Sequence, residues 1–218
     1  MILQLVLGAV LGAIISAMLT VLLDYERQPK LTFSIEAPPY DAHYGPGAPA
    51  TEGRYLRLRV SNEGPWSRWM LRLPATQCRA EITFHHLDGQ NVLGRTMAGR
   101  WSETPEPLTI PIVSGHTVIS QIIDSARLTA DSHIDIQPGQ STLLDIAARF
   151  DADDDCYGWN NEAYLTPSPW RNPLWRLPNN RYDVRVAVVS GGRRWTHAAR
   201  LVNDLSRQDF RLEPITPR

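Results

Sequence analysis

A single apolar run at the N-terminus, residues 2–23, constrains this chain more than any other feature. It holds no charged residue and is interrupted only by Gln4, Ser16 and Thr20. A helix of about 20 apolar residues, rising roughly 1.5 Å per residue, crosses the hydrocarbon core of a bilayer. The run is longer than the apolar core of a signal peptide, and no Lys or Arg precedes it. The sequence therefore predicts an uncleaved transmembrane anchor over residues 1–24.

Charges beside the run predict on which side of the cell membrane the rest of the chain lies. Arg27 and Lys30 follow the run, whereas its N-terminal side offers only the α-amine. The positive-inside rule then favours a single-pass protein with a cytoplasmic domain. The compartment is not settled by Cys78 and Cys156, which fit either one disulfide in an oxidising compartment or two free thiols in the cytosol.

Small residues within the run predict helix pairing. Gly8, Gly12 and Ser16 fall at four-residue spacing, which places them on one face of a helix. Such a face lets two backbones approach closely in lipid, so a homo-oligomer or a partner helix is expected. The alternative is that these residues are ordinary anchor composition, because glycine is frequent in spanning helices.

After the anchor, apolar and polar residues alternate with the period of two that is typical of half-buried strands. Leu56, Leu58 and Val60 face one side, and Arg57 and Arg59 face the other. The same pattern recurs along the chain, and strands are expected over residues 31–36, 55–60, 78–86, 133–136, 142–150, 182–189, 195–201 and 210–212.

Turn signals between these strands favour antiparallel pairing. Asp88-Gly89 and Gly191-Gly192 are hairpin turns, and residues 137–140 form a tight turn between two strands. Residues 117–128 fit either a helix or a strand. The predicted fold is mainly β: an antiparallel immunoglobulin-like β-sandwich preceded by one transmembrane helix. The expected organisation is an anchor at 1–24, a first strand and a Pro/Gly-rich loop at 25–53, and the sandwich domain at 54–218.

Two short motifs carry a resemblance to known proteins. Residues 56–64 end in Asn62-Glu63-Gly64, and residues 134–140 contain Pro138-Gly139. They resemble the strand-Asn-x-Gly and strand-Pro-Gly-strand elements of prokaryotic immunoglobulin-like modules, including the CARDB-like group. With its anchor, the chain is similar to uncharacterised prokaryotic single-pass membrane proteins that carry such a domain. The resemblance implies architecture and membrane attachment, and it implies no catalytic residue.

One constellation of acidic residues has the spacing of a calcium loop. Asp151, Asp153, Asp155 and Glu162 occupy positions 1, 3, 5 and 12, from which an EF-hand supplies oxygen ligands to Ca²⁺. Cys156, however, stands where that loop requires glycine. The four carboxylates are therefore a weak Ca²⁺ candidate, and a solvated acidic loop is the competing interpretation.

Other chemistry leaves little trace in the sequence. There is no nucleophile elbow, phosphate loop or dinucleotide fingerprint, and the six histidines show no ligand spacing. A net charge of −1 creates no field that would gather nucleic acid. Seven tryptophans lie mostly in turn-rich segments, as packing residues or as partner contacts.

The expected function is a membrane-anchored, non-catalytic binding or assembly module that acts through protein contact. No cofactor is expected beyond a possible role for Ca²⁺. The alternatives are a Ca²⁺-dependent cell-envelope module and a hydrolase with a site that the sequence does not reveal.

Overall fold

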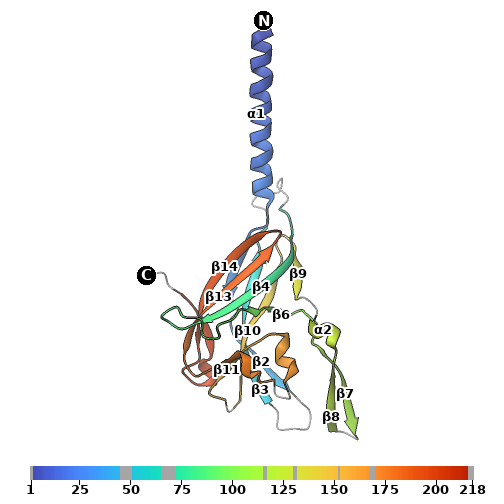
Figure 1. Cartoon of the computed structure of the whole chain (residues 1–218), viewed down its shortest axis with the longest axis vertical. Coiled ribbons are helices and arrows are strands. Elements are labelled where there is room, and N and C mark those ends of the chain that lie inside the picture. The colour runs from blue at the N-terminus through green and yellow to red at the C-terminus, as the bar shows by residue number, and fades with distance from the viewer. Residues whose placement is uncertain are drawn as a thin grey trace.

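A long N-terminal helix leads into a domain built mainly from antiparallel strands (Figure 1). The computed structural model describes residues 2–44, 51–64, 72–114, 117–129, 132–151, 153–166 and 170–215. The helix, α1 (Ile2–Arg27), extends away from one end of the domain, which we call the junction end. The opposite end, where residues 53 and 150 pair, is called the distal end.

The first sheet, sheet A, has the strand order β1-β3-β10-β11-β12, with β2 paired to β3 and β6 paired to β10. All of its pairings are antiparallel. Its strands are β1 (Leu31–Ile35), β2 (Tyr40–Tyr44), β3 (Thr51–Asn62), β6 (Arg100–Trp101), β10 (Ser141–Phe150), β11 (Cys156–Gly158) and β12 (Arg176–Leu177).

The second sheet, sheet B, has the order β15-β14-β13-β4-β5, with β9 paired to β4. Its strands are β4 (Ala75–His85), β5 (Met97–Ala98), β9 (His133–Ile136), β13 (Arg181–Ser190), β14 (Arg193–Val202) and β15 (Arg211–Pro214). A separate hairpin joins β7 (Leu108–Ser114) to β8 (Thr117–Ile123), and short helices complete the described part: α2 (Ser125–Thr129), η1 (Asn161–Leu165), η2 (Pro173–Trp175) and η3 (Arg207–Asp209).

The two sheets pack face to face as a β-sandwich, which confirms the predicted antiparallel fold class. Alternate residues of the central strands point inward and are almost completely buried, as the period-two pattern requires. The interior is formed by Leu56, Leu58 and Val60 of β3, Leu144 and Ile146 of β10, Ile82 and Phe84 of β4, Val184, Val186 and Val188 of β13, and Ala199 and Leu201 of β14.

A β-bulge in β10 changes which residues face the interior. The register with β3 shifts between Asp145 and Ala147, so Ile146 is the extra residue. Before the bulge Asp145 faces outward. Beyond it, Ile146 and Ala147 both join the interior, and Ala148 and Phe150 turn to the outer face of sheet A. The bulge thereby places a second apolar cluster outside the sandwich core.

Three expectations about local structure have different outcomes. Residues 37–53 are not one long loop, because Tyr40–Tyr44 forms β2 and β3 begins at Thr51. β2 pairs with β3, although the prolines and glycines of this segment predicted no strand. The segment 117–128 was predicted to be either a helix or a strand, and it contains both: the strand β8 is followed by the short helix α2. The predicted strand, tight turn and strand over residues 133–150 are present, and the turn at 137–140 carries the chain from sheet B to sheet A.

Asn62 is the hub of the junction end. Its side chain is 1% exposed, and its Oδ1 accepts a hydrogen bond from the Lys30 backbone N–H at 3.1 Å. Its Nδ2 donates to the carbonyls of Leu73 and Ile136, each at 3.1 Å. The Leu73 N–H in turn donates to the Arg27 carbonyl at 2.6 Å. The end of α1 is therefore tied to both sheets.

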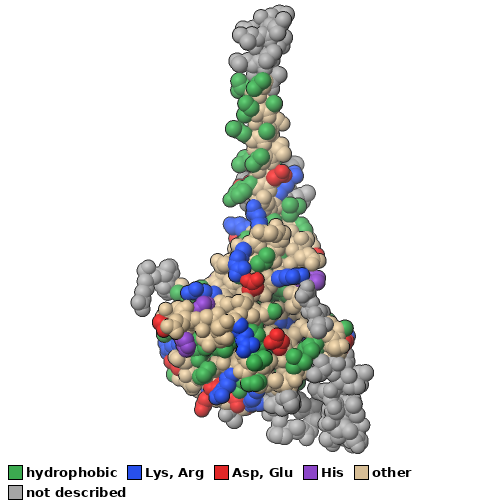
Figure 2. Space-filling model, in the orientation of Figure 1, with side chains coloured by type: hydrophobic (Ala, Val, Ile, Leu, Met, Phe, Trp, Pro, Cys, Tyr) green, Lys and Arg blue, Asp and Glu red, His purple; other side chains and the backbone are tan. Residues whose placement is uncertain are grey.

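Apolar side chains of α1 remain uncovered. From Val10 to Leu22 they are 49–69% exposed, and Figure 2 shows them along the helix beyond the domain. Within the residues that the structure describes, no helix is long and apolar enough to cross a membrane.

Candidate functional site

The distal end gathers the acidic segment that was predicted to bind calcium. Asp151 pairs with Arg207, with 2.8 Å between Oδ1 and Nη1, and Asp153 and Asp155 pair with arginines from the next turn-rich segment. These partners are Arg171 for Asp153 and Arg176 for Asp155.

The fourth candidate ligand, Glu162, is engaged elsewhere. It lies in η1, and its Oε2 accepts a hydrogen bond from Trp175 Nε1 at 2.6 Å. Across the described parts of the chain, no three His, Cys, Asp or Glu residues are grouped so that they could hold a metal ion. The acidic segment is thus held by arginines drawn from distant positions in the sequence, and the structure does not bring the four predicted ligands together.

We expect millimolar Ca²⁺ to leave the melting temperature unchanged, because each carboxylate already has a partner. Occupancy of a real site at one hundred times its dissociation constant would add about 2.7 kcal/mol to the free energy of unfolding. Differential scanning fluorimetry with Ca²⁺, and with Mg²⁺ as the control ion, measures this. A saturable rise that is abolished by Asp153→Asn would show that a Ca²⁺ site exists.

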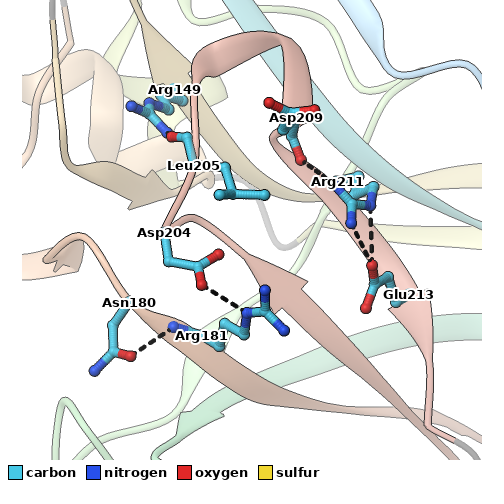
Figure 3. A network of polar contacts seen from close by, with 8 residues as sticks. All are labelled: Arg149, Asn180, Arg181, Asp204, Leu205, Asp209, Arg211 and Glu213. Atoms are coloured by element: carbon cyan, nitrogen blue, oxygen red, sulfur yellow. Dashed lines mark hydrogen bonds and ion pairs between the residues drawn. The ribbon is translucent and has the colours of Figure 1, made fainter.

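A buried arginine fixes the loops beside this segment (Figure 3). Arg149 of β10 is 4% exposed, and it donates to the Asp153 carbonyl at 2.9 Å. It also donates at 2.7 Å to the carbonyl of Leu205, which Figure 3 draws beside it. Its Nη1 also donates to Asn203 Oδ1 at 3.1 Å. Nearby contacts drawn in Figure 3 join Arg181 to Asn180 and Asp204, and Arg211 to Asp209 and Glu213. The polar groups of these residues hydrogen-bond to one another, so we assign them a structural role.

A polar cavity of about 310 Å³ opens on the outer face of sheet A; we call it the Asp145 cavity. Asp145 is 3% exposed and lies between Arg57 of β3 and Arg100 of β6, its neighbours across the two adjacent strands. Its Oδ1 accepts from Arg57 Nε at 2.8 Å and from Ser102 Oγ at 2.7 Å. The β-bulge follows directly after Asp145, a position where bulges often aim a side chain into a site.

Arg100 is a buried charged group of this cavity that is only partly hydrogen-bonded. It is 3% exposed, and its two Nη atoms donate to the carbonyls of Trp101 at 3.2 Å and Thr104 at 2.7 Å. Its Nε is buried and has no hydrogen-bond partner. Because buried polar groups are nearly always hydrogen-bonded, this buried Nε is an exception to the usual pattern.

Aromatic rings form the other walls of the Asp145 cavity. Tyr40 stands at the rim, 50% exposed, with the Arg57 guanidinium 4.2 Å from its ring centroid. Trp159 and Tyr164 line the inner side and contact each other edge to face at 5.5 Å. They belong to a distal aromatic cluster with Tyr55, Phe150 and Trp170.

Four of the tryptophans are buried either in the sandwich core or in the distal aromatic cluster. Trp101 and Trp175 are buried in the sandwich core, and Trp159 and Trp170 in the distal aromatic cluster. Packing, rather than partner contact, therefore accounts for these four residues. Trp66 and Trp69 lie outside the described residues.

A larger depression of about 670 Å³ lies on the outer face of sheet B. Its lining comes mainly from β4, β13 and β14 and includes exposed residues such as Arg185, Arg194 and Thr196. Arg194 pairs with Glu81 at 2.7 Å. We consider this depression the solvated face of the sheet, because its arginines are exposed to water; His197 Nε2, which belongs to its lining, is buried without a hydrogen-bond partner.

The two cysteines and two of the histidines have structural surroundings. Cys78 and Cys156 are both free and buried, so of the two alternatives the structure shows free thiols. Burial raises the pKa of both. His197 stacks on Phe33 with ring centroids 5.4 Å apart, and burial lowers its pKa. His85 contacts Thr83 Oγ1 at 2.9 Å within its own strand.

The cavity residues were not singled out from the sequence as a site. Asp145 and Ser102 carry no motif, and their proximity depends on the pairing of β6 with β10. The one available signal was a carboxylate, Asp145, within an otherwise apolar strand, because a charged residue inside such a strand is rarely buried unless it is paired.

No protein-family model matches this chain, and no curated protein or solved structure shows significant similarity to it.

Proposed function

We propose that this protein is a single-pass membrane protein that displays an immunoglobulin-like β-sandwich as a non-catalytic binding or assembly module. One observation carries the proposal: α1 presents a band of apolar side chains that the sandwich does not cover. Exposed apolar surface is unfavourable in water by about 25 cal/mol per Å². A lipid bilayer is the surrounding that removes this cost along the whole run of residues 2–23, which contains no charge.

The immunoglobulin-like assignment is supported by how the two motifs meet. The Gly139 N–H donates to the Asn62 carbonyl at 2.8 Å, and the Asn62 N–H donates to the Gln140 carbonyl at 3.0 Å. The strand-Asn-x-Gly and Pro-Gly elements are therefore adjacent at the junction end. The likeness to CARDB-like modules remains our proposal.

A cytoplasmic position of the domain is supported by two features. Arg27 and Lys30 follow the apolar run directly. The two cysteines are unpaired, as is usual for proteins of a reducing compartment.

Helix pairing is the proposed route to assembly in the membrane. A Cβ built on Gly12 would meet nothing within 4 Å, so this side of α1 is open to a second helix. Gly8 and Ser16 lie one turn before and after it in α1. Whether this face binds a second copy or a partner helix is part of the same proposal.

We expect the full chain to remain in membranes washed with alkaline carbonate, and deletion of residues 2–23 to release a folded domain. To locate the domain, a cysteine is introduced by Gln90→Cys in the exposed turn after β4. A membrane-impermeant maleimide should label this variant only after the cells are lysed.

The wild-type chain is the matched control for labelling, because Cys78 and Cys156 are buried and react slowly. Recovery of the full chain in the soluble fraction would disprove the anchor. Labelling of Gln90→Cys in intact cells would place the domain on the outer side.

A further inference from the structure

We propose that the Asp145 cavity binds a neutral, polyhydroxylated ligand, a saccharide of one or two rings. The inference rests on the proposal that the domain is a binding module, and it does not depend on the anchor. It is carried by the balance of charge in the cavity, by the guanidinium and carboxylate groups that line it and by its aromatic rim.

Charge balance selects against a charged ligand. Arg57 and Arg100 flank Asp145 on the two adjacent strands, and with Glu106 the lining holds two positive groups and two negative ones. Asp145 is already compensated by Arg57 at 2.8 Å. An added carboxylate or ammonium would bring a net charge into a largely buried site, and an uncompensated buried charge is strongly unfavourable.

Hydroxyl groups match the hydrogen-bonding groups that remain. A hydroxyl both donates and accepts, so a sugar hydroxyl can accept a hydrogen bond from a guanidinium that lines the cavity while its own proton goes to a carboxylate oxygen. Glu106 is exposed at the cavity mouth and offers such an oxygen. A bound anion would satisfy only the donors, and a bound cation only the acceptors.

The walls and the size of the cavity fit a sugar ring. Tyr40 is exposed at the rim and provides apolar ring surface next to the polar groups, whereas Trp159 and Tyr164 are almost wholly buried. A pyranose likewise carries C–H groups beside its hydroxyls. The volume of about 310 Å³ lies at the lower end of the range of small-molecule sites. This is room for a small ligand and too little for a folded partner.

The test titrates the purified full chain with D-glucose, D-galactose, N-acetyl-D-glucosamine, maltose and cellobiose. If the chain needs a detergent, one without a sugar headgroup is used. Isothermal calorimetry and tryptophan fluorescence, to which Trp159 contributes, follow binding. At least one probe should bind saturably, with a dissociation constant of roughly millimolar or below, the range in which a few hydrogen bonds and one stacked ring place a small ligand.

Two rim substitutions decide whether this cavity is the site. Tyr40→Ala and Glu106→Gln remove an exposed ring and an exposed carboxylate, so both should keep the fold and weaken binding about tenfold or more. Thr196→Ala, in the depression of sheet B, is the matched control and should bind as the wild type does. Glutamate and tetramethylammonium serve as charged probes and should not bind.

Absence of saturable binding by every saccharide would overturn the inference, as would binding that neither rim substitution weakens or binding of the charged probes alone. Membrane fractionation and labelling are separate measurements, so failure of the anchor and failure of the saccharide site are told apart.

Discussion

Replacing Trp101 by alanine should lower the free energy of unfolding by about 3–5 kcal/mol, the usual cost of removing a fully buried tryptophan. Trp101 is completely buried between the sheets, and its Nε1 donates to the Cys78 carbonyl at 3.1 Å. In a domain of this size each kcal/mol lowers the melting temperature by roughly 2–4 °C. Thermal and urea unfolding of the variant measure the loss.

Two further substitutions separate the contributions of Trp101. Trp101→Phe keeps a ring in the core but leaves the Cys78 carbonyl without its donor, which should cost about 1–3 kcal/mol together with the smaller ring volume. Trp195→Ala removes a partly buried tryptophan of β14 and is the matched control. If Trp101→Ala were no more destabilising than Trp195→Ala, the ring would not join the two sheets as described.

Replacing Asn62 by alanine should cost about 3 kcal/mol, because three backbone groups lose their partner at once. These are the Lys30 N–H and the carbonyls of Leu73 and Ile136, each 3.1 Å from the Asn62 amide. Since the same contacts tie α1 to the sandwich, hydrogen exchange should rise at Lys30 and Leu73 before the rest of the domain opens.

A second substitution at this position predicts a pH dependence with a definite sign. Asn62→Asp keeps the acceptor for Lys30 but points a carboxyl at two carbonyl oxygens in a buried place, which raises its pKa in the folded state. The folded variant then binds the proton more tightly than the unfolded chain, so its stability falls as pH rises through the folded pKa. A variant that lost stability toward acid instead would contradict this role of Asn62.

Among the features that the sequence alone predicted, the hairpin of β13 and β14 is the clearest. Gly191 and Gly192 both have positive φ, as the turn between Ser190 and Arg193 requires. The inward faces of β3, β4 and β13 also follow from the sequence, because alternation is a local property of each strand. The long apolar N-terminal segment likewise predicts a helix, and α1 spans this segment.

What the tertiary structure decided depends on contacts between residues far apart in the chain. The bulge at Ile146 reverses the facing of Ala148 and Phe150, and nothing in the local pattern marks the extra residue. The residues at 137–140 predict a tight turn between two strands, and the strand pairing decides that this turn carries the chain from one sheet to the other.

The two candidate sites show the same division. Carboxylate spacing suggested a calcium loop at 151–162, whereas the fold brings Arg171, Arg176 and Arg207 to three of those carboxylates. The Asp145 cavity has no motif, because its acid and its two arginines come from three strands that are adjacent only in the sheet. The periodicity of a strand depends on residues that are neighbours in the sequence. Charge pairing and cavity shape depend on which strands pair, and strand pairing is determined only when the whole chain packs.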